Sequence, residues 1–359
     1  MNGAFITDCE GPISKNDNAY ETTSHFVKGG KKLFTVISRY DDVVADILHR
    51  PGYKAGETVK LVLPFLKACG ATDRKMQEYS RKNLILIAHA KETLQYIQNH
   101  AESFIVSTSY EHYIHVMCDA LGFPCKNAYC TQFSLKNYAL PLSEENRLME
   151  IAAEIETMPL FEISLDACSL PSLPPSTMNC IKRLDEIFKE VKSMEIGRIY
   201  NDVITMGGSE KAEAVKDASR RAGTDLHNVM YVGDSITDVQ AFRLIRQRGG
   251  LATSFNGNRY AVENTEIAVL SESSLVTAVL ADVFLRKGKA EALRFAENWS
   301  RETLLKSSVD SKILRRFFEV FPHRLPKVEK VTGQNMKSLI EASSRFRKKV
   351  RGEAIGKLG

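Results

Sequence analysis

The 359-residue sequence predicts an α/β protein built on a doubly wound parallel sheet, with a helical cap and a helical C-terminal extension. Two observations lead to this prediction. Short apolar runs of strand length alternate with longer segments of helical periodicity, which is the order expected when helices connect parallel strands. Polar and acidic residues directly follow several of these runs, and the carboxyl ends of parallel strands form the ligand crevice of such sheets.

The individual elements follow from local pattern. The first strand is predicted at 4–7, where an apolar run ends in the turn-like sequence Asp-Cys-Glu-Gly-Pro. The pattern is helical from Tyr20 to about Lys82, with a C-cap signal at Gly70, and another helix is expected over 84–100. The elements expected next are strands at 103–107, 127–133, 228–232, 250–254 and 266–270, and helices at 110–121, 177–193, 211–222, 237–248 and 272–286. The last 70 or so residues are expected to be helical.

These elements divide the chain into a core with additions. The segments are the first core strand (1–14), a helical cap (15–83), core (84–136), a mostly helical insert (137–199), core (200–285) and a basic helical C-terminal extension (286–359).

Composition indicates the compartment in which the protein is expected. The seven cysteines include no C-x-x-C pair, which argues against a disulfide framework or a zinc site and favours reduced thiols. No stretch approaches the ~18 uninterrupted apolar residues of a membrane span. The N-terminus lacks the pattern of a secretory signal, so we expect a cytoplasmic protein.

Charge is distributed unevenly along the chain. From Arg286 to Gly359 there are 19 Lys and Arg against 8 Asp and Glu, whereas the remaining residues are mildly acidic. Such a tail can attract an acidic partner, a nucleic acid or a membrane surface. A solvated amphipathic tail explains the same composition equally well.

Four polar clusters lie at predicted element boundaries. Taken alone, each has an ordinary explanation, such as a turn or a helix N-cap. Their joint occurrence in this order is far more specific. The clusters are Asp8 and Glu10 after the first strand, Ser107 and Thr108 after the second, Lys211 at a helix start, and Asp234 and Asp238 after the strand at 228–232.

These residues suit phosphoryl transfer. A phosphate monoester is a dianion, so a carboxylate nucleophile needs positive charge beside it. Asp8 and Asp234 can supply oxygens to Mg²⁺, Lys211 can neutralise the phosphoryl group, and the Ser107 hydroxyl can bind its oxygens. Glu10 lies on the same side of an extended segment as Asp8 and can protonate the leaving oxygen and later activate water. The combination predicts a covalent aspartyl phosphate on Asp8.

At these positions the sequence resembles the haloacid dehalogenase-like superfamily, over roughly 1–14, 84–136 and 200–285. The resemblance implies a Rossmann-like core in which Asp8 is the nucleophile. It also implies that Mg²⁺ is bound by the Asp8 carboxylate, the Glu10 backbone carbonyl and Asp234, while Asp238 supports the metal indirectly or holds Lys211. The matching motifs are Asp8-Cys9-Glu10-Gly11, Ser107, Lys211 and the GDSITD sequence at 233–238.

Glu10 departs from the family pattern, because most members have Asp there. Enolase-phosphatase and a phosphoserine–homoserine phosphotransferase also resemble D-x-E-G, so phosphatase and phosphotransferase both stay open. The stretch at 252–258, ATSFNGN, resembles the phosphoserine-phosphatase and sugar-phosphatase branches, which carry a helical cap where this chain has 15–83. The overall layout bears a weaker likeness to archaeal proteins labelled energy-converting hydrogenase A subunit R, which implies membership of a complex.

The sequence therefore supports a small-molecule phosphatase first and an accessory or regulatory subunit second. The partner expected is a small phosphorylated substrate, and a protein partner is considered for the basic C-terminal region. Nucleic-acid binding lacks a recognisable module, so no DNA partner is expected. The region after Arg286 is expected to lie outside the chemistry, because no motif residue follows Asp238.

Overall fold

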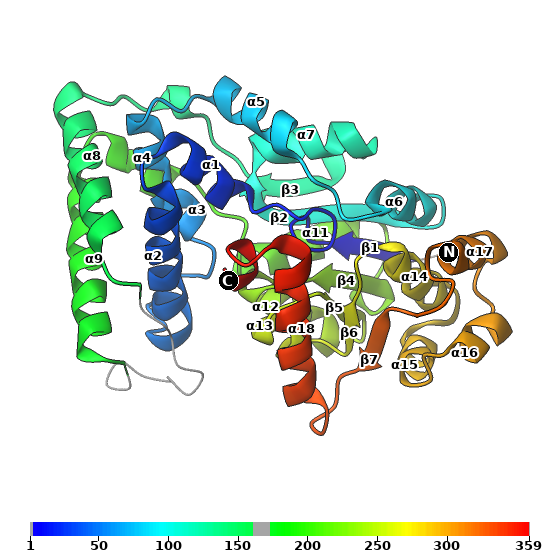
Figure 1. Cartoon of the computed structure of the whole chain (residues 1–359). Coiled ribbons are helices and arrows are strands. Elements are labelled where there is room, and N and C mark those ends of the chain that lie inside the picture. Colours follow the sequence, from blue (N-terminus) through cyan, green and yellow to red (C-terminus); the bar gives the residue numbers. More distant parts are fainter. Residues whose placement is uncertain (1–2, 161–172, 359) are drawn as a thin grey trace.

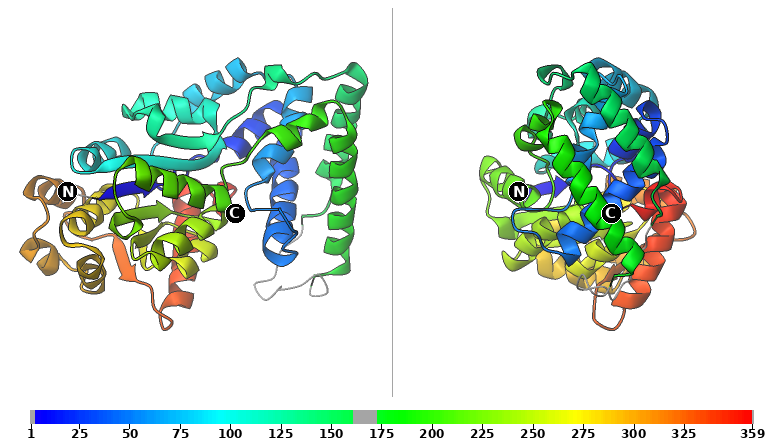
Figure 2. Two further views of the ribbon diagram at one scale, coloured as in Figure 1. Left: turned by 180° about the vertical axis from the view of Figure 1, so that it is seen from behind. Right: turned by 90° about the vertical axis from the view of Figure 1, so that its left-hand side faces the viewer.

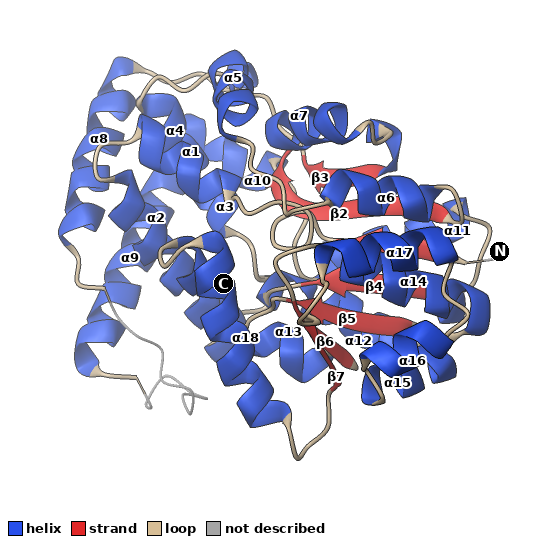
Figure 3. Cartoon of the chain, turned by 45° about the vertical axis from the view of Figure 1, so that its right-hand side comes forward, coloured by secondary structure: helices blue, strands red, loops and turns tan. Residues whose placement is uncertain are grey.

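The structure, a computed structural model, describes residues 3–160 and 173–358. Its centre is a seven-stranded sheet in the order β3-β2-β1-β4-β5-β6-β7, in which every neighbouring pair except β6–β7 is parallel. Helices cover both faces of this twisted sheet (Figure 3). The strands are β1 Ala4–Thr7, β2 Glu102–Tyr110, β3 Ala128–Thr131, β4 Val229–Gly233, β5 Leu251–Phe255, β6 Ile267–Leu270 and β7 Lys327–Lys330.

The central strands are buried on both faces, as parallel strands between two helix layers must be. In β1, Phe5 packs into an apolar cluster on one face, whereas Ala4 and Ile6 pack into a second cluster on the other. The first face is covered by α6 Ala90–Gln98, α7 Glu111–Leu121 and α14 Leu275–Lys287. The second is covered by α11 Ser209–Arg221, α12 Val239–Gln247 and α13 Arg259–Asn264.

The cap and the insert form one helical body beside the sheet (Figures 1 and 2). Their apolar side chains share a single buried cluster, and Arg50 binds Asp185 through two hydrogen bonds of 2.6 Å that join the two segments. The helices are α1 Asn18–Phe26, α2 Gly30–Asp42 with a π-helical continuation over Val43–Ile47, α3 Thr58–Leu61, α4 Leu63–Ala68, α5 Asp73–Asn83, α8 Leu142–Thr157, α9 Pro175–Ser193 and α10 Ile199–Asp202.

The C-terminal extension packs on the core. Phe295 and Phe317 lie in the same apolar cluster as the β-strands, and Leu339 packs against Val262 and Ala268. The last helix ends in the region between the sheet and the helical body (Figure 1). The extension contains α15 Lys289–Glu297, α16 Arg301–Lys306, α17 Ser311–Val320, β7 and α18 Met336–Arg351.

The predicted α/β fold and its parallel strands are confirmed, and two details of the prediction are wrong. The helix expected over 84–100 begins only at Ala90, because Leu86 and Ala88 form β-bridges with other segments. The extension is not wholly helical, because β7 adds an antiparallel edge strand. The C-cap at Gly70 is confirmed by its positive φ of 76°.

Two expectations from composition can be compared with the described ranges. The six cysteines found there are free thiols. Within the same residues no helix is both long enough and apolar enough to cross a bilayer.

Candidate active site

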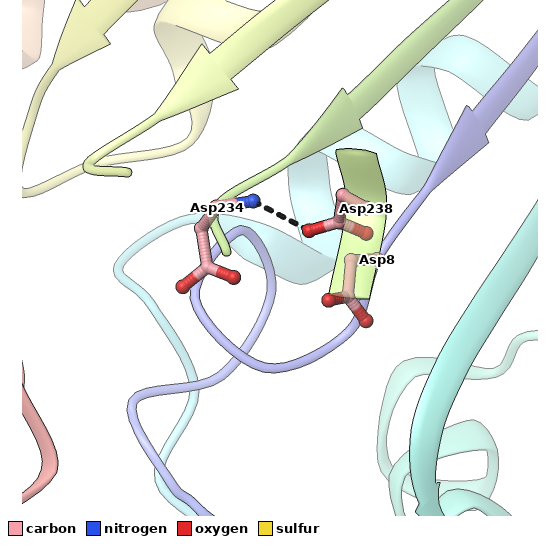
Figure 4. A group of neighbouring side chains, drawn as sticks. All are labelled: Asp8, Asp234 and Asp238. Carbon is pink, nitrogen blue, oxygen red and sulfur yellow. Dashed lines mark hydrogen bonds between the residues drawn. The ribbon is translucent and has the colours of Figure 1, made fainter. Parts of the chain in front are cut away.

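The ends of the central strands bring the predicted residues together. Asp8 directly follows β1 and Asp234 directly follows β4, and the backbone N–H of Asp8 donates to the carbonyl of Val232 at 2.8 Å. Ser107 lies inside β2, two residues beyond the partner of Thr7, so the strand is longer than predicted. Lys211 lies in the first turn of α11. The carboxylates of Asp8, Asp234 and Asp238 lie close together at this edge (Figure 4).

Lys211 connects two of these carboxylates. Its Nζ lies 2.7 Å from Oδ2 of Asp8 and 2.7 Å from Oδ1 of Asp238, and the lysine is completely buried. A buried ammonium group is stable only when opposite charge compensates its lost hydration. The two carboxylates therefore fix Lys211 with its charge directed at Asp8.

Four donors hold Asp238. Oδ1 accepts hydrogen bonds from Lys211 and from the hydroxyl of Tyr231, both at 2.7 Å. Oδ2 accepts from the backbone N–H groups of Asp234 at 2.9 Å and Ser235 at 3.1 Å. Because both oxygens are engaged, Asp238 orients Lys211 and shapes the loop that carries Asp234.

The turn after β1 needs a glycine. Gly11 has a φ of 108°, which side-chain-bearing residues rarely adopt, and a Cβ atom there would lie 2.1 Å from Oδ2 of Asp234. The glycine thus lets the turn after β1 approach Asp234 closely, which explains why position 11 carries no side chain.

Burial changes the ionisation of the acidic residues. It raises the pKa of Asp8 to about 7, although the charge of Lys211 acts to lower it. Burial also raises the pKa of Glu10 well above its usual value, and the charge of Asp17 adds to this shift. A raised pKa favours the protonated carboxyl group, which is the form that can donate a proton to a leaving oxygen, so the direction of the shift suits Glu10 to act as a general acid.

A cavity of about 100 Å³ lies above Asp8. The cap closes one side of it, because Gly56 of the cap approaches the methyl groups of Thr108 and Thr237 so closely that a Cβ atom would be 3.1 Å from each. The charged residues that line the cavity come from the sheet, the cap and the C-terminal extension: Asp8, Glu10, Asp17, Asp41, Asp42, Asp234, Arg347 and Arg351.

The pH dependence of stability tests the burial of the cap carboxylates. Burial raises the pKa of Asp42 from its ordinary value of 3.8 to about 7, and the charge of Asp41 adds to the effect. Such a group stabilises the folded protein below its unfolded pKa and loses that contribution as pH rises through its folded pKa. We therefore expect Asp42→Asn to raise the free energy of unfolding more at pH 8 than at pH 5, in urea titrations without divalent cations. An equal effect at both pH values would contradict the raised pKa.

A sequence model of haloacid dehalogenase-like hydrolases matches residues 54–282, which is more than half of the chain. The chain belongs to this family. The matched region includes Ser107, Lys211 and Asp234 but begins after Asp8. The role of Asp8 as the nucleophile therefore stays a prediction from its own motif and from its position after β1. No curated protein matches the chain.

Several solved structures align with this haloacid dehalogenase-like hydrolase. A gene product of Archaeoglobus fulgidus aligns with a TM-score of 0.79 and 25% identity, over 100% of this chain and 99% of that chain, so the likeness includes the C-terminal extension. Substrate-bound phosphoserine phosphatase aligns with a TM-score of 0.43 and 13% identity, over 76% of this chain and 95% of that chain. A phospho-aspartyl intermediate analogue of phosphoserine phosphatase gives 0.42 and 14%, over 74% and 92%.

The gene product of Archaeoglobus fulgidus is not named as a hydrogenase subunit. The weaker likeness to such proteins therefore stays a prediction.

The donor set of this family member fits a small divalent cation. Asp8, Asp234 and Asp238 are buried and each offers a carboxylate oxygen within 4.8 Å of the others. Mg²⁺ prefers hard oxygen ligands of this kind. Because Asp238 already accepts four hydrogen bonds, Asp8 and Asp234 are the carboxylates with capacity to bind the ion directly, together with the carbonyl of Glu10 that the family resemblance implies.

Sequence analysis missed both cationic residues of the described cavity lining, as well as the cap carboxylates Asp17, Asp41 and Asp42. Arg347 and Arg351 of α18 are only 3% and 8% exposed, and both form ion pairs with Oδ2 of Asp234. The extension therefore contributes side chains to the cavity, although no motif residue follows Asp238. Their spacing of four residues does place both arginines on one helix face, but the surrounding RFRKKVR sequence resembles a solvated basic helix.

Proposed function

We propose that the protein is a magnesium-dependent phosphatase that hydrolyses a small phosphate monoester through an aspartyl phosphate on Asp8. The observation that supports this most strongly is the surroundings of Asp8 at the cavity. Lys211 lies 2.7 Å from its carboxylate, and an Asp234 oxygen lies within 4.8 Å. A carboxylate can attack a phosphate dianion where positive charge is held in place beside both groups.

The first half-reaction transfers the phosphoryl group to the enzyme. A carboxylate oxygen of Asp8 attacks phosphorus, and the bond between phosphorus and the ester oxygen breaks. Glu10 donates its proton to that departing oxygen. Lys211 neutralises the phosphoryl oxygens and the Ser107 hydroxyl donates to them, while a bound Mg²⁺ supplies further positive charge.

The second half-reaction regenerates Asp8. Glu10, now ionised, removes a proton from water, and the water oxygen attacks phosphorus as the acyl–phosphate bond breaks. Oε1 of Glu10 accepts a hydrogen bond of 2.6 Å from the backbone N–H of Asn18, the first residue of α1. The acid–base group is thus tied to the start of the cap, so its position depends on how the cap is placed.

A panel of phosphate esters assayed with Mg²⁺ tests this proposal. We expect the wild-type protein to release inorganic phosphate from a defined class of small esters, and Asp8→Asn to release it at least ~10³-fold more slowly. A folded wild-type protein that binds Mg²⁺ but hydrolyses no ester faster than Asp8→Asn would favour the accessory-subunit function. Transfer of the phosphoryl group to an added alcohol in preference to water would identify a phosphotransferase.

A further inference from the structure

Two arginines from the C-terminal helix share one carboxylate oxygen of the active site. Arg347 and Arg351 both donate from Nη1 to Oδ2 of Asp234, with the Arg351 contact at 3.0 Å. Arg351 also donates to the backbone carbonyls of Lys15 and Asn16. The helix that carries them is anchored to the core through Leu339, so its end remains beside the cavity.

This arrangement places the arginines in competition with a divalent cation. Asp234 is one of the carboxylates with capacity to bind the ion, and two guanidinium groups bring to it the same total charge that Mg²⁺ would bring. Like charges repel strongly in a buried site, where water screens them little. A cation that binds Asp234 is repelled by both guanidinium groups, so its binding favours their departure from Oδ2.

The guanidinium of Arg347 also has unused donor capacity. Its Nε is buried and, within the described part of the chain, has no hydrogen-bond partner, and its side chain lines the cavity. A buried donor without an acceptor is costly, so an acceptor brought into the cavity would be bound favourably. The planar fork of an arginine matches the oxygens of a phosphate group.

The charge of the cavity points to the same ligand. Its described lining includes six carboxylate side chains, and Arg347 and Arg351 are the cationic residues among that lining. A phosphate dianion entering so acidic a cavity needs these two charges in addition to Lys211 beneath it.

We propose that Arg347 and Arg351 are substrate-binding residues that exchange partners, leaving Asp234 when a divalent cation binds there and binding the phosphate group of the substrate instead. This inference rests on the proposed function, because it takes the ligand of the cavity to be a phosphate ester. It makes the C-terminal extension part of the active site and couples metal binding to anion binding.

Two calorimetric titrations of the full-length protein test the exchange, one with Mg²⁺ alone and one with inorganic phosphate at saturating Mg²⁺. For Arg347→Met and Arg351→Met we expect Mg²⁺ to bind ~10-fold tighter or more, because each variant removes a positive charge that competes with the ion at Asp234. We expect phosphate to bind ~10- to 100-fold weaker, because each variant loses a charge-assisted hydrogen bond to it. Lys349→Met is the matched control, because Lys349 lies on the same helix but pairs with Glu272 at the surface. It should leave both affinities unchanged.

The exchange predicts that the affinities for Mg²⁺ and for phosphate change in opposite directions. A purely structural role of the two arginines would not produce this result. Weaker binding of both ligands would mean that the arginines only hold Asp234 in position, and unchanged affinities would place them outside ligand binding; either result overturns the exchange. If a methionine variant does not fold, Arg347→Lys keeps the charge but loses the fork, and wild-type phosphate affinity in that folded variant would also overturn it. Neither titration requires turnover. If the two affinities shift in opposite directions but the protein hydrolyses no ester, the anion-binding site is supported and the proposed phosphatase activity is rejected.

Discussion

Asp8→Asn is expected to lower the rate of ester hydrolysis by at least ~10³-fold, equivalent to about 4 kcal/mol of activation free energy. The amide has nearly the same shape as the carboxylate but is a poor nucleophile. The fold should survive, because Lys211 keeps its second counter-ion, Asp238, at 2.7 Å. Single-turnover phosphate release measures the rate, and thermal unfolding checks that the variant is folded.

Asp225→Asn is the control for this substitution, because Asp225 is highly exposed and precedes β4, at the end of the sheet away from Asp8. It should retain the wild-type rate. Retention of a tenth of that rate by Asp8→Asn would show that another group is the nucleophile.

Lys211→Met is expected to damage both chemistry and stability. The substitution removes the cation beside the phosphoryl oxygens, which should cost ~10²- to 10³-fold in rate. It also leaves Asp8 and Asp238 buried without their shared counter-ion, and breaking a buried ion pair typically costs about 3–5 kcal/mol. Because the charge of Lys211 acts to lower the pKa of Asp8, its removal raises that pKa further, so the loss of stability should be greater at pH 8 than at pH 5.

Lys216→Met separates this effect from the loss of any lysine on the same helix. Lys216 is a partly exposed residue of α11 that pairs with Glu213. Urea unfolding and phosphate release should both remain near wild type in this control. A Lys211→Met protein with wild-type stability would show that the two carboxylates do not depend on the lysine.

The site residues that could be predicted from the sequence lie at positions fixed by the order of strands and helices. Asp8 and Asp234 each follow a buried strand directly, and parallel neighbouring strands end at the same edge of a sheet, so the sequence alone placed them together. Lys211 begins a helix whose N-terminus returns to that edge. These relations depend on local pattern and on topology, both of which can be read from the order of the elements.

The arginines of α18 were not predictable in this way. Their position depends on β7 and on the packing of Leu339. Because β7 pairs antiparallel with β6, it carries the chain away from the active-site edge, and α18 then runs back toward that edge. Both are contacts between residues far apart in the sequence, which no local pattern predicts. The positive charge of the segment can be read from the sequence. Whether an arginine faces solvent or lines the cavity depends on its burial, which only the assembled fold determines.

Trapping the covalent intermediate tests the central claim most directly. Wild-type protein is mixed with a substrate found in the ester panel, quenched in acid within one turnover, and the peptide that contains Asp8 is examined by mass spectrometry. The account predicts one phosphoryl group on Asp8, present in the wild type and absent from Asp8→Asn. Turnover without any phosphoryl group on Asp8, or with the group on Ser107 instead, would contradict it.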